Sequence, residues 1–191
     1  RSAHPESYPD LVVECRVIPN EEIGAYVATI PEEDKCVAYK TGIVMARTGV
    51  EGEKVHTELK TMIDGRCYIL SEEDNVVRNC DVALDVVITN VSSTSNERYV
   101  VKAAKFGSTY TPAESEPSCE DGIAAVPAYD PRVMSKVSEN IIIMTLWGAP
   151  AVCLAGSYIV TYNAETKDYN TIEKDAFAST YTIESGSRKR S

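Results

Sequence analysis

β-Branched residues dominate this chain. Val, Ile and Thr together supply 50 of its 191 residues, whereas Leu supplies only 6. A β-branched side chain loses rotamer freedom in a helix but fits the pleated surface of a sheet, and the 11 tyrosines favour strands as well. The sequence therefore predicts an all-β fold, either an antiparallel β-sandwich or a closed β-barrel of about ten strands.

Several segments alternate apolar and polar residues, as half-buried antiparallel strands do. The clearest are 54–63 and 81–89, and a longer strand is expected at 152–162. The run 141–147 is apolar on both faces, which is typical of a central strand. Further strands are expected at 11–17, 23–30, 37–47, 66–70, 98–105, 123–126 and 177–183.

Turn residues separate these strands at short intervals. A hairpin loop is expected at 48–53, an Asp-Gly turn at Asp64-Gly65, and a further connection at 163–168. Gly148-Ala149-Pro150 predicts a tight reversal between two apolar strands. The stretch 108–122 carries no strand pattern and is expected to be a long loop.

Helices are expected only as two short connectors. Ser71 precedes three acids and could cap a helix that ends near Asn79. Asp130-Pro131 is typical of a helix start, which predicts a second connector as far as Ser138. No internal repeat is apparent, so a single domain is expected at 9–184, between flexible tails at 1–8 and 185–191.

Charge narrows the choice of partners. With 19 basic and 29 acidic residues the net charge is −10, which disfavours nucleic acid and could steer basic protein partners instead. No apolar run is long enough for a membrane helix. In the C-terminal tail, Arg188-Lys189-Arg190 resembles a proprotein-convertase cleavage site, although a remnant of a cloning vector would look the same.

Six cysteines are scattered along the chain, and no two of them are close enough for a zinc knuckle or a redox pair. An even, scattered count favours three disulfides in a secreted, extracellular protein over six free core thiols. Asn90-Val91-Ser92 is a glycosylation acceptor sequence, which favours the same compartment. The predicted disulfide cysteines are Cys15, Cys36, Cys67, Cys80, Cys119 and Cys153.

No motif for catalysis or for a cofactor is present. His56 is expected on the wet face of a strand and His4 in a tail, so neither is a candidate base. The acidic clusters lack the spacing of an EF-hand, and thiol–imidazole metal sites are excluded if the cysteines are oxidised. The sequence therefore predicts no catalytic residue, no metal, no cofactor and no enzymatic activity.

A binding function remains as the prediction, and two kinds of binding protein are compatible with the sequence. The favoured one is a secreted, disulfide-stabilised protein that engages another protein with a basic surface, as an immune modulator or a receptor or viral ectodomain does. The alternative is a barrel that carries a small apolar or aromatic ligand. The residues expected to line its pocket are Trp147, Tyr158, Tyr162 and Val86.

A resemblance to a known protein family supports the carrier alternative. In length, acidity and expected β-content the chain resembles the lipocalin-type secreted barrels of arthropods. That likeness implies a closed barrel with a lined cavity. The Gly-x-Trp signature near the first lipocalin strand is absent, because the only Trp is Trp147, and no late helix is expected here. The alternative therefore depends on whether Trp147 adjoins a cavity or lies in a packed core.

Overall fold

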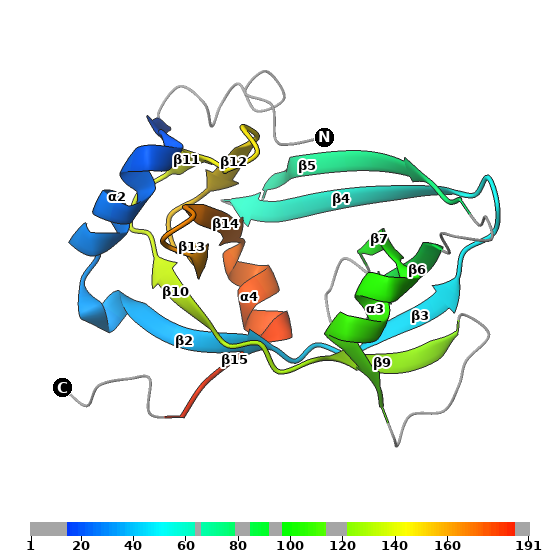
Figure 1. The fold of residues 1–191 in the computed structure, drawn as a ribbon. Helices are drawn as coiled ribbons and strands as arrows, with labels where there is room; N and C mark the ends of the chain where they lie inside the picture. Colours follow the sequence, from blue (N-terminus) through cyan, green and yellow to red (C-terminus); the bar gives the residue numbers. More distant parts are fainter. Residues whose placement is uncertain (1–14, 64–65, 79–84, 92–96, 114–121, 186–191) are drawn as a thin grey trace.

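The computed structural model describes residues 15–63, 66–78, 85–91, 97–113 and 122–185, with only the backbone described for 58–72 (Figure 1). Strands predominate, so the expectation of a mostly β protein is confirmed. Three short helices accompany them in the described residues: α2 (Ile23–Thr29), α3 (Ala103–Thr109) and α4 (Lys174–Thr180). Two 3-10 turns, η2 (Asn20–Glu22) and η3 (Glu32–Asp34), flank α2.

The described strands form four sheets. A three-stranded sheet has the order β1-β11-β12 and a two-stranded one consists of β4 and β5; two five-stranded sheets have the orders β14-β13-β10-β2-β15 and β7-β6-β3-β9-β8. Every one of these sheets has two end strands, so none of them closes into the barrel that was one expectation. The strand bounds are β1 Arg16–Ile18, β2 Lys35–Lys40, β3 Val44–Thr48, β4 Lys54–Ile63, β5 Arg66–Val76, β6 Asp85–Asn90, β7 Arg98–Lys102, β8 Tyr110–Pro112, β9 Ile123–Pro127, β10 Arg132–Lys136, β11 Ile141–Met144, β12 Pro150–Cys153, β13 Tyr158–Asn163, β14 Asp168–Ile172 and β15 Tyr181–Ile183.

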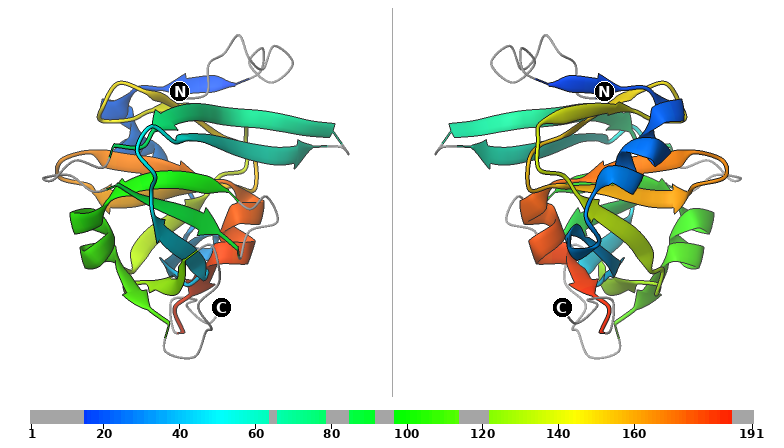
Figure 2. Two further views of the ribbon diagram at one scale, coloured as in Figure 1. Left: turned by 90° about the vertical axis from the view of Figure 1, so that its right-hand side faces the viewer. Right: turned by 90° about the vertical axis from the view of Figure 1, so that its left-hand side faces the viewer.

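The two five-stranded sheets have the same topology. In one, the hairpin β13–β14 is followed by α4 and β15; in the other, the hairpin β6–β7 is followed by α3 and β8. We call the first sheet with its helix the α4 unit and the second the α3 unit. They form the left and right parts of the molecule in Figure 1, and the side views of Figure 2 show α3 and α4 on opposite flanks.

The equivalence holds residue by residue. Ala38 in β2 pairs with Arg132 on one side and Ile183 on the other. Ala125 in β9 likewise lies between Val44 and Pro112. Both alanines are fully buried, each in the fourth strand of its five-stranded sheet. The matching register shows that the two units are repeats of one structural pattern.

The chain order shows how the repeats are connected. After β3 the hairpin β4–β5 is inserted before β6, and after β10 the hairpin β11–β12 is inserted before β13. The fourth strand of the α3 sheet, β9, follows β8 directly, whereas its counterpart β2 comes from the N-terminal side of the chain. The links β2–β3 and β9–β10 therefore each cross from one unit to the other.

A short sequence motif accompanies the repeat. Residues 106–111 read Phe-Gly-Ser-Thr-Tyr-Thr and residues 177–182 read Phe-Ala-Ser-Thr-Tyr-Thr. Each copy covers the end of a helix and the start of the following short strand. The expectation that the chain has no internal repeat was therefore wrong. The repeat is hard to find in the sequence because only this motif is recognisably similar in both units.

Each unit also has its own core, built from equivalent positions. The core of the α4 unit contains Ala38, Met134, Val160 and Phe177, and that of the α3 unit contains Ala125, Ala46, Ile88 and, partly buried, Phe106. A third cluster joins β1 and α2 to β11, β12 and β13. The small β1-β11-β12 sheet is thereby fixed to the α4 unit.

Two expected strands contain helices instead. Segment 23–30 forms α2, in which Ile23, Val27 and Ile30 recur at helical spacing and pack into one core. Segment 177–183 contains the end of α4 before the short strand β15. Both segments were predicted as strands because of their β-branched residues. The helical period in each spans only two turns, which is too short to stand out in the sequence.

Both expected connector helices are strands. Segment 71–79 contains the end of β5, and 130–138 contains β10, which is paired on both sides, with β13 and β2. Two partner strands satisfy the backbone of β10, so tertiary pairing overrode the Asp130-Pro131 helix signal. Expected strands 37–47 and 152–162 are each broken in two, the second by a turn in which Gly156 has φ +90°.

Two of the expected turns are confirmed, and the strands on either side of a third are paired as expected. β13 and β14 form a hairpin across 163–168, where the Asn163 side chain accepts hydrogen bonds from the backbone of Glu165 and Thr166. Gly148, at φ +77°, donates its N–H to the Thr145 carbonyl in the reversal between β11 and β12. β4 and β5 pair as the two arms of a hairpin, although the tip at 64–65 lies outside the described residues. Loop 48–53 joins β3 to β4, which belong to different sheets, so it is not a hairpin loop.

Candidate binding cleft

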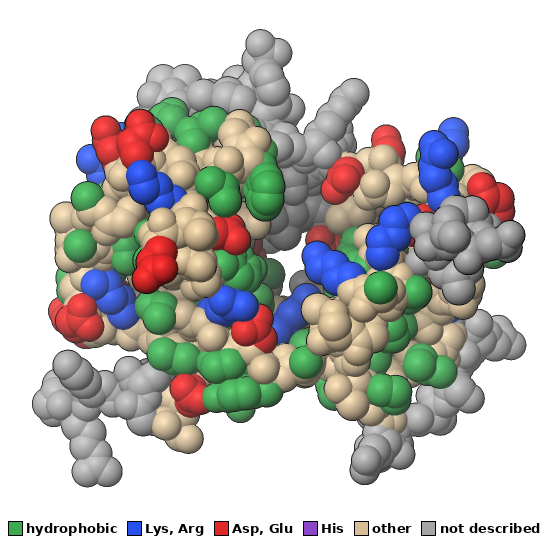
Figure 3. Space-filling model, in the orientation of Figure 1, with side chains coloured by type: hydrophobic (Ala, Val, Ile, Leu, Met, Phe, Trp, Pro, Cys, Tyr) green, Lys and Arg blue, Asp and Glu red, His purple; other side chains and the backbone are tan. Residues whose placement is uncertain are grey.

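A cleft of about 550 Å³ lies where the two units meet. In Figure 3 it is a deep hollow between the two parts of the molecule, with Lys and Arg side chains on its rim. Both units contribute to its walls, and the β9–β10 link crosses it. The lining residues are Lys40, Tyr99, Val101, Lys105, Ser108, Thr109, Tyr110, Pro127, Ala128, Tyr129, Asp130, Arg132, Val160, Tyr162 and Tyr181.

The repeated motif places one tyrosine from each unit in this cleft. In the α3 unit, Tyr110 stacks on Phe106 with ring centroids 5.2 Å apart. In the α4 unit, Tyr181 stacks on Phe177 at 5.6 Å. Each helix thus supplies a phenylalanine from its buried side, which orients the tyrosine that follows it.

Tyrosines of both units interact at the cleft: Tyr99 with Tyr110 within the α3 unit, and Tyr110 with Tyr181 between the units. The hydroxyls of Tyr99 and Tyr110 are hydrogen bonded at 2.7 Å. Burial raises the pKa of Tyr99 and of Tyr181, and the neighbouring phenols raise both further. Burial raises the pKa of Tyr162 as well. These phenols therefore stay protonated at neutral pH and can donate hydrogen bonds.

Three cations also line the cleft. The Arg132 guanidinium lies 5.2 Å from the centre of the Tyr162 ring, and it donates to the Tyr162 carbonyl at 2.9 Å and to the Asp130 carboxylate at 2.8 Å. The Lys40 ammonium lies 5.8 Å from the centre of the Tyr99 ring. Lys105, in α3, is exposed at the rim.

Of the four residues expected to bind a ligand, only Tyr162 lines the cleft. Tyr158 lies behind the wall, where its ring stacks on Phe177 at 4.1 Å. Val86 holds the equivalent position in the α3 unit and packs into that core. Trp147 is 82% exposed at the turn between β11 and β12, so it is neither in a core nor in this cleft.

The described cysteines form no disulfide bond with one another. Cys153 is a buried thiol, and burial raises its pKa to about 12. Cys15 and Cys36 are half-buried, whereas Cys80 and Cys119 lie outside the described residues and the side chain of Cys67 is not described. The expectation of three disulfides with no free thiol does not hold for Cys153, and the extracellular location stays a prediction.

Asn90 lies at the end of β6 with a buried side chain. A glycan attached there would require that side chain to turn outwards, so glycosylation stays a prediction that this burial disfavours. His56, on β4, pairs with Asp74 across the hairpin at 2.6 Å, and both side chains are exposed. His4 lies outside the described residues.

Sequence reasoning missed most of the cleft, including Lys40, Tyr99, Tyr110, Arg132 and Tyr181. The signal that could have found two of them is the repeated Phe-x-Ser-Thr-Tyr-Thr motif, because both of its tyrosines face the cleft. Within the described segments, no three His, Cys, Asp or Glu side chains converge on a point where a metal ion could be held. None of the helices described is long and apolar enough to span a membrane.

Comparison with known proteins gives no match. No protein-family model fits the chain, and no curated protein or solved structure is significantly similar to it. The functional argument therefore depends on the cleft and on the repeat that forms it.

Proposed function

We propose that this is a non-enzymatic binding protein that takes up a small organic ligand in the cleft between its two units. The observation that carries the proposal is the cleft itself, whose volume of about 550 Å³ is in the range of small-molecule sites. Its apolar walls, formed partly by Val101, Val160 and Pro127, carry tyrosine rings that could contact a ligand through both ring and hydroxyl.

The position of the cleft supports the same proposal. Ligands bind preferentially at the interfaces between structural units, where two rigid walls can present side chains to one molecule. Here the walls come from equivalent strands of two repeats, so each is held by its own sheet and core. The ligand site we propose therefore lies between the units and not inside a barrel.

A pair of matched variants tests this proposal. Ser108 lines the cleft, while its equivalent in the other repeat, Ser179, does not. Both are exposed helix residues. The Ser108 hydroxyl donates to the backbone carbonyl of Lys105, and the Ser179 hydroxyl donates to that of Asp175. We expect Ser108→Trp to fill part of the cleft and Ser179→Trp to leave it open.

The measurement is a fragment screen by ligand-observed NMR, followed by mapping of amide shifts on the protein. Hits should shift amides in both units around Tyr110 and Tyr181, and Ser108→Trp should abolish their binding while Ser179→Trp retains it. Native mass spectrometry of protein from its natural source would show whether a small molecule is retained. A screen in which no hit is lost in Ser108→Trp would contradict the proposal.

Binding to another protein is the second candidate, and one observation favours it. Leu146 and Trp147 are both exposed at the turn between β11 and β12, and exposed aromatic residues often anchor protein interfaces. A photo-crosslinking amino acid at position 147 should capture one partner, with a basic surface if the charge of −10 steers it. Trp147→Ala should then weaken binding to that isolated partner, and unchanged affinity would exclude this surface.

A further inference from the structure

The cleft differs in charge from the rest of the molecule. Its lining contains three cations, Lys40, Lys105 and Arg132, and one carboxylate, Asp130, which gives 3 − 1 = +2 in a chain of net charge −10. Three further carboxylates interact with lining residues: Glu97 with Lys40, Asp168 with Tyr162, and Glu184, which accepts a hydrogen bond from the Tyr129 hydroxyl. Cations gathered in a concave, partly apolar site focus a positive potential there.

The hydrogen-bonding groups of the cleft are mainly donors. Asp130 is the only carboxylate in the lining, and Arg132 already donates to it. The phenols of Tyr99, Tyr162 and Tyr181 are protonated at neutral pH, as tyrosine ordinarily is, and burial raises the pKa of each further. A phenol can donate as well as accept a hydrogen bond. A ligand that satisfies such a set must supply acceptors, and preferably charged ones.

The Arg132 guanidinium has five N–H groups, of which the described hydrogen bonds use two. Its two terminal nitrogens donate to the Tyr162 carbonyl and to Asp130, but its Nε is buried and has no hydrogen-bond partner. A buried donor without a partner is costly, because it has lost its water. Because Nε is shielded even from water, what Arg132 offers a ligand in the cleft is the positive charge of its guanidinium at the wall.

From this arrangement we infer that the cleft recognises a small organic anion: a flat or ring-shaped apolar body that ends in a carboxylate, sulfate, sulfonate or phosphate group. The anionic group lies among Lys40, Lys105 and Arg132, and the apolar body lies on the tyrosine rings beside Val101 and Val160. This inference deepens the proposed function and rests on it, since it names the ligand class of the same cleft.

The test compares probes that share a ring and differ in charge. Naphthalene-2-sulfonate and the neutral naphthalene-2-sulfonamide have nearly the same shape, and 2-naphthoate and 2-naphthyl phosphate rank the other anions. Dissociation constants come from amide shifts in protein-observed NMR. We expect the sulfonate to bind about tenfold more tightly than the sulfonamide, because a hydrogen bond to a charged acceptor is stronger than one to a neutral acceptor. Added salt should weaken the sulfonate only.

Lysine variants test whether the cations of the cleft are the groups that bind the anionic probe. Lys40→Gln combined with Lys105→Gln should weaken the sulfonate about tenfold and leave the sulfonamide unchanged. The matched control is Lys136→Gln, an exposed β10 lysine outside the cleft, which should leave both affinities unchanged. Circular dichroism and thermal unfolding confirm that the variants are folded.

The outcomes separate the two proposals. Equal affinities for sulfonate and sulfonamide, with shifts confined to the cleft, would overturn the anion inference and leave the proposed function standing. A loss of sulfonate affinity that is as large in Lys136→Gln as in the double variant would also overturn it. Probes that bind elsewhere, or with the same affinity in Ser108→Trp, would overturn both proposals.

Discussion

The α4 and α3 units share strand order, register and a motif, yet different interactions stabilise them. In the α4 unit, Phe177 is 7% exposed and lies between the rings of Tyr158 and Tyr181. In the α3 unit, Phe106 is only half-buried and stacks on Tyr110 alone among the described rings. The first unit relies more on aromatic packing than the second.

The α3 unit instead has ion pairs at positions where the α4 unit has other polar contacts. Lys102 pairs with the buried Asp85, which also accepts the N–H of Arg78. The equivalent positions in the α4 unit are Glu173 and Ser157, and there Glu173 caps α4 by accepting the N–H groups of the next turn. One pair of positions thus joins two strands in one repeat and starts a helix in the other.

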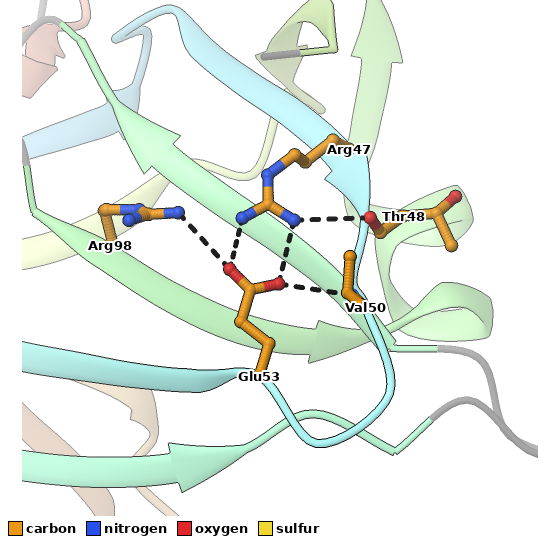
Figure 4. Close-up of polar contacts among 5 residues, drawn as sticks. All are labelled: Arg47, Thr48, Val50, Glu53 and Arg98. Carbon is orange, nitrogen blue, oxygen red and sulfur yellow. Dashed lines mark hydrogen bonds and ion pairs between the residues drawn. The ribbon is translucent and has the colours of Figure 1, made fainter.

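A second ion-pair cluster strengthens the same contrast. The Glu53 carboxylate accepts hydrogen bonds from the Arg47 guanidinium and from the Val50 N–H, and Arg98 lies 3.7 Å away (Figure 4). The residue equivalent to Arg47 in the α4 unit is Ser135, a buried serine whose hydroxyl has no hydrogen-bond partner. The comparison shows that the same strand topology forms with charged pairs at these positions in one unit and with serine in place of one member of each pair in the other.

The largest expected effect comes from the two phenylalanines. Phe177→Ala should cost about 3–5 kcal/mol, because it leaves a cavity between two stacked tyrosines. Phe106→Ala should cost only about 1–2 kcal/mol, because less of that ring is buried. Urea unfolding of both variants measures the difference. Equal losses of unfolding free energy in the two variants would show that the two phenylalanines stabilise the protein to the same extent.

Acid should destabilise the α3 unit first. Hydrogen bonding to Arg47 lowers the pKa of Glu53 from 4.5 to about 2, and hydrogen bonding to Lys102 lowers the pKa of Asp85. A carboxyl with a lowered folded pKa stabilises the fold above its unfolded pKa, and this contribution is lost as the pH falls through the folded value. The loss of the Glu53 contribution alone should cost roughly 2–3 kcal/mol between pH 4.5 and about pH 2, and Asp85 acts in the same direction.

NMR of backbone amides across that pH range tests this order. Amides of β6 and β7 should lose their native shifts before those of β13 and β14. In Glu53→Gln the neutral-pH stability should already be lower and the acid difference smaller. Simultaneous loss in both units at every pH would contradict the contrast.

The helix caps predict a smaller effect. Glu173→Ala removes the acceptor for the N–H groups of Asp175 and Ala176, which should cost about 0.5–2 kcal/mol. α3 has no side-chain cap, because Lys102, at the equivalent position, pairs with Asp85. Thermal unfolding gives the loss. A Glu173→Ala protein as stable as the parent would show that the cap contributes nothing.

The smallest expected effect is a gain. Gly107 in α3 stands where α4 has Ala178, and a Cβ there would meet no atom within 4 Å. Gly107→Ala should therefore stabilise the protein by about 0.5–1 kcal/mol. The reciprocal Ala178→Gly should destabilise it by a similar amount. Loss of stability in both variants would show that Gly107 is needed for another reason.

Local chemistry was sufficient to predict much of the secondary structure. The excess of β-branched residues over leucine gives a mostly β protein, and the turns at 148–150 and 163–168 lie where Gly, Pro and Asn predict them. Tyr162, which was expected to line a ligand pocket because it ends an alternating strand, lines the cleft. Each of these features depends on residues within a few positions of one another, which a sequence pattern records directly.

Only the tertiary structure decided which strands pair and what their pairing brings together. Tyr110 and Tyr181 are 71 residues apart in the chain, and they share a cleft because β8 and β15 occupy equivalent edges of two sheets. β10 became a strand, against its local helix signal, because β2 and β13 flank it. Pairing of this kind depends on complementary surfaces between distant segments, which no local period records. The sequence determined that strands would form, and the packing of two repeats determined the site.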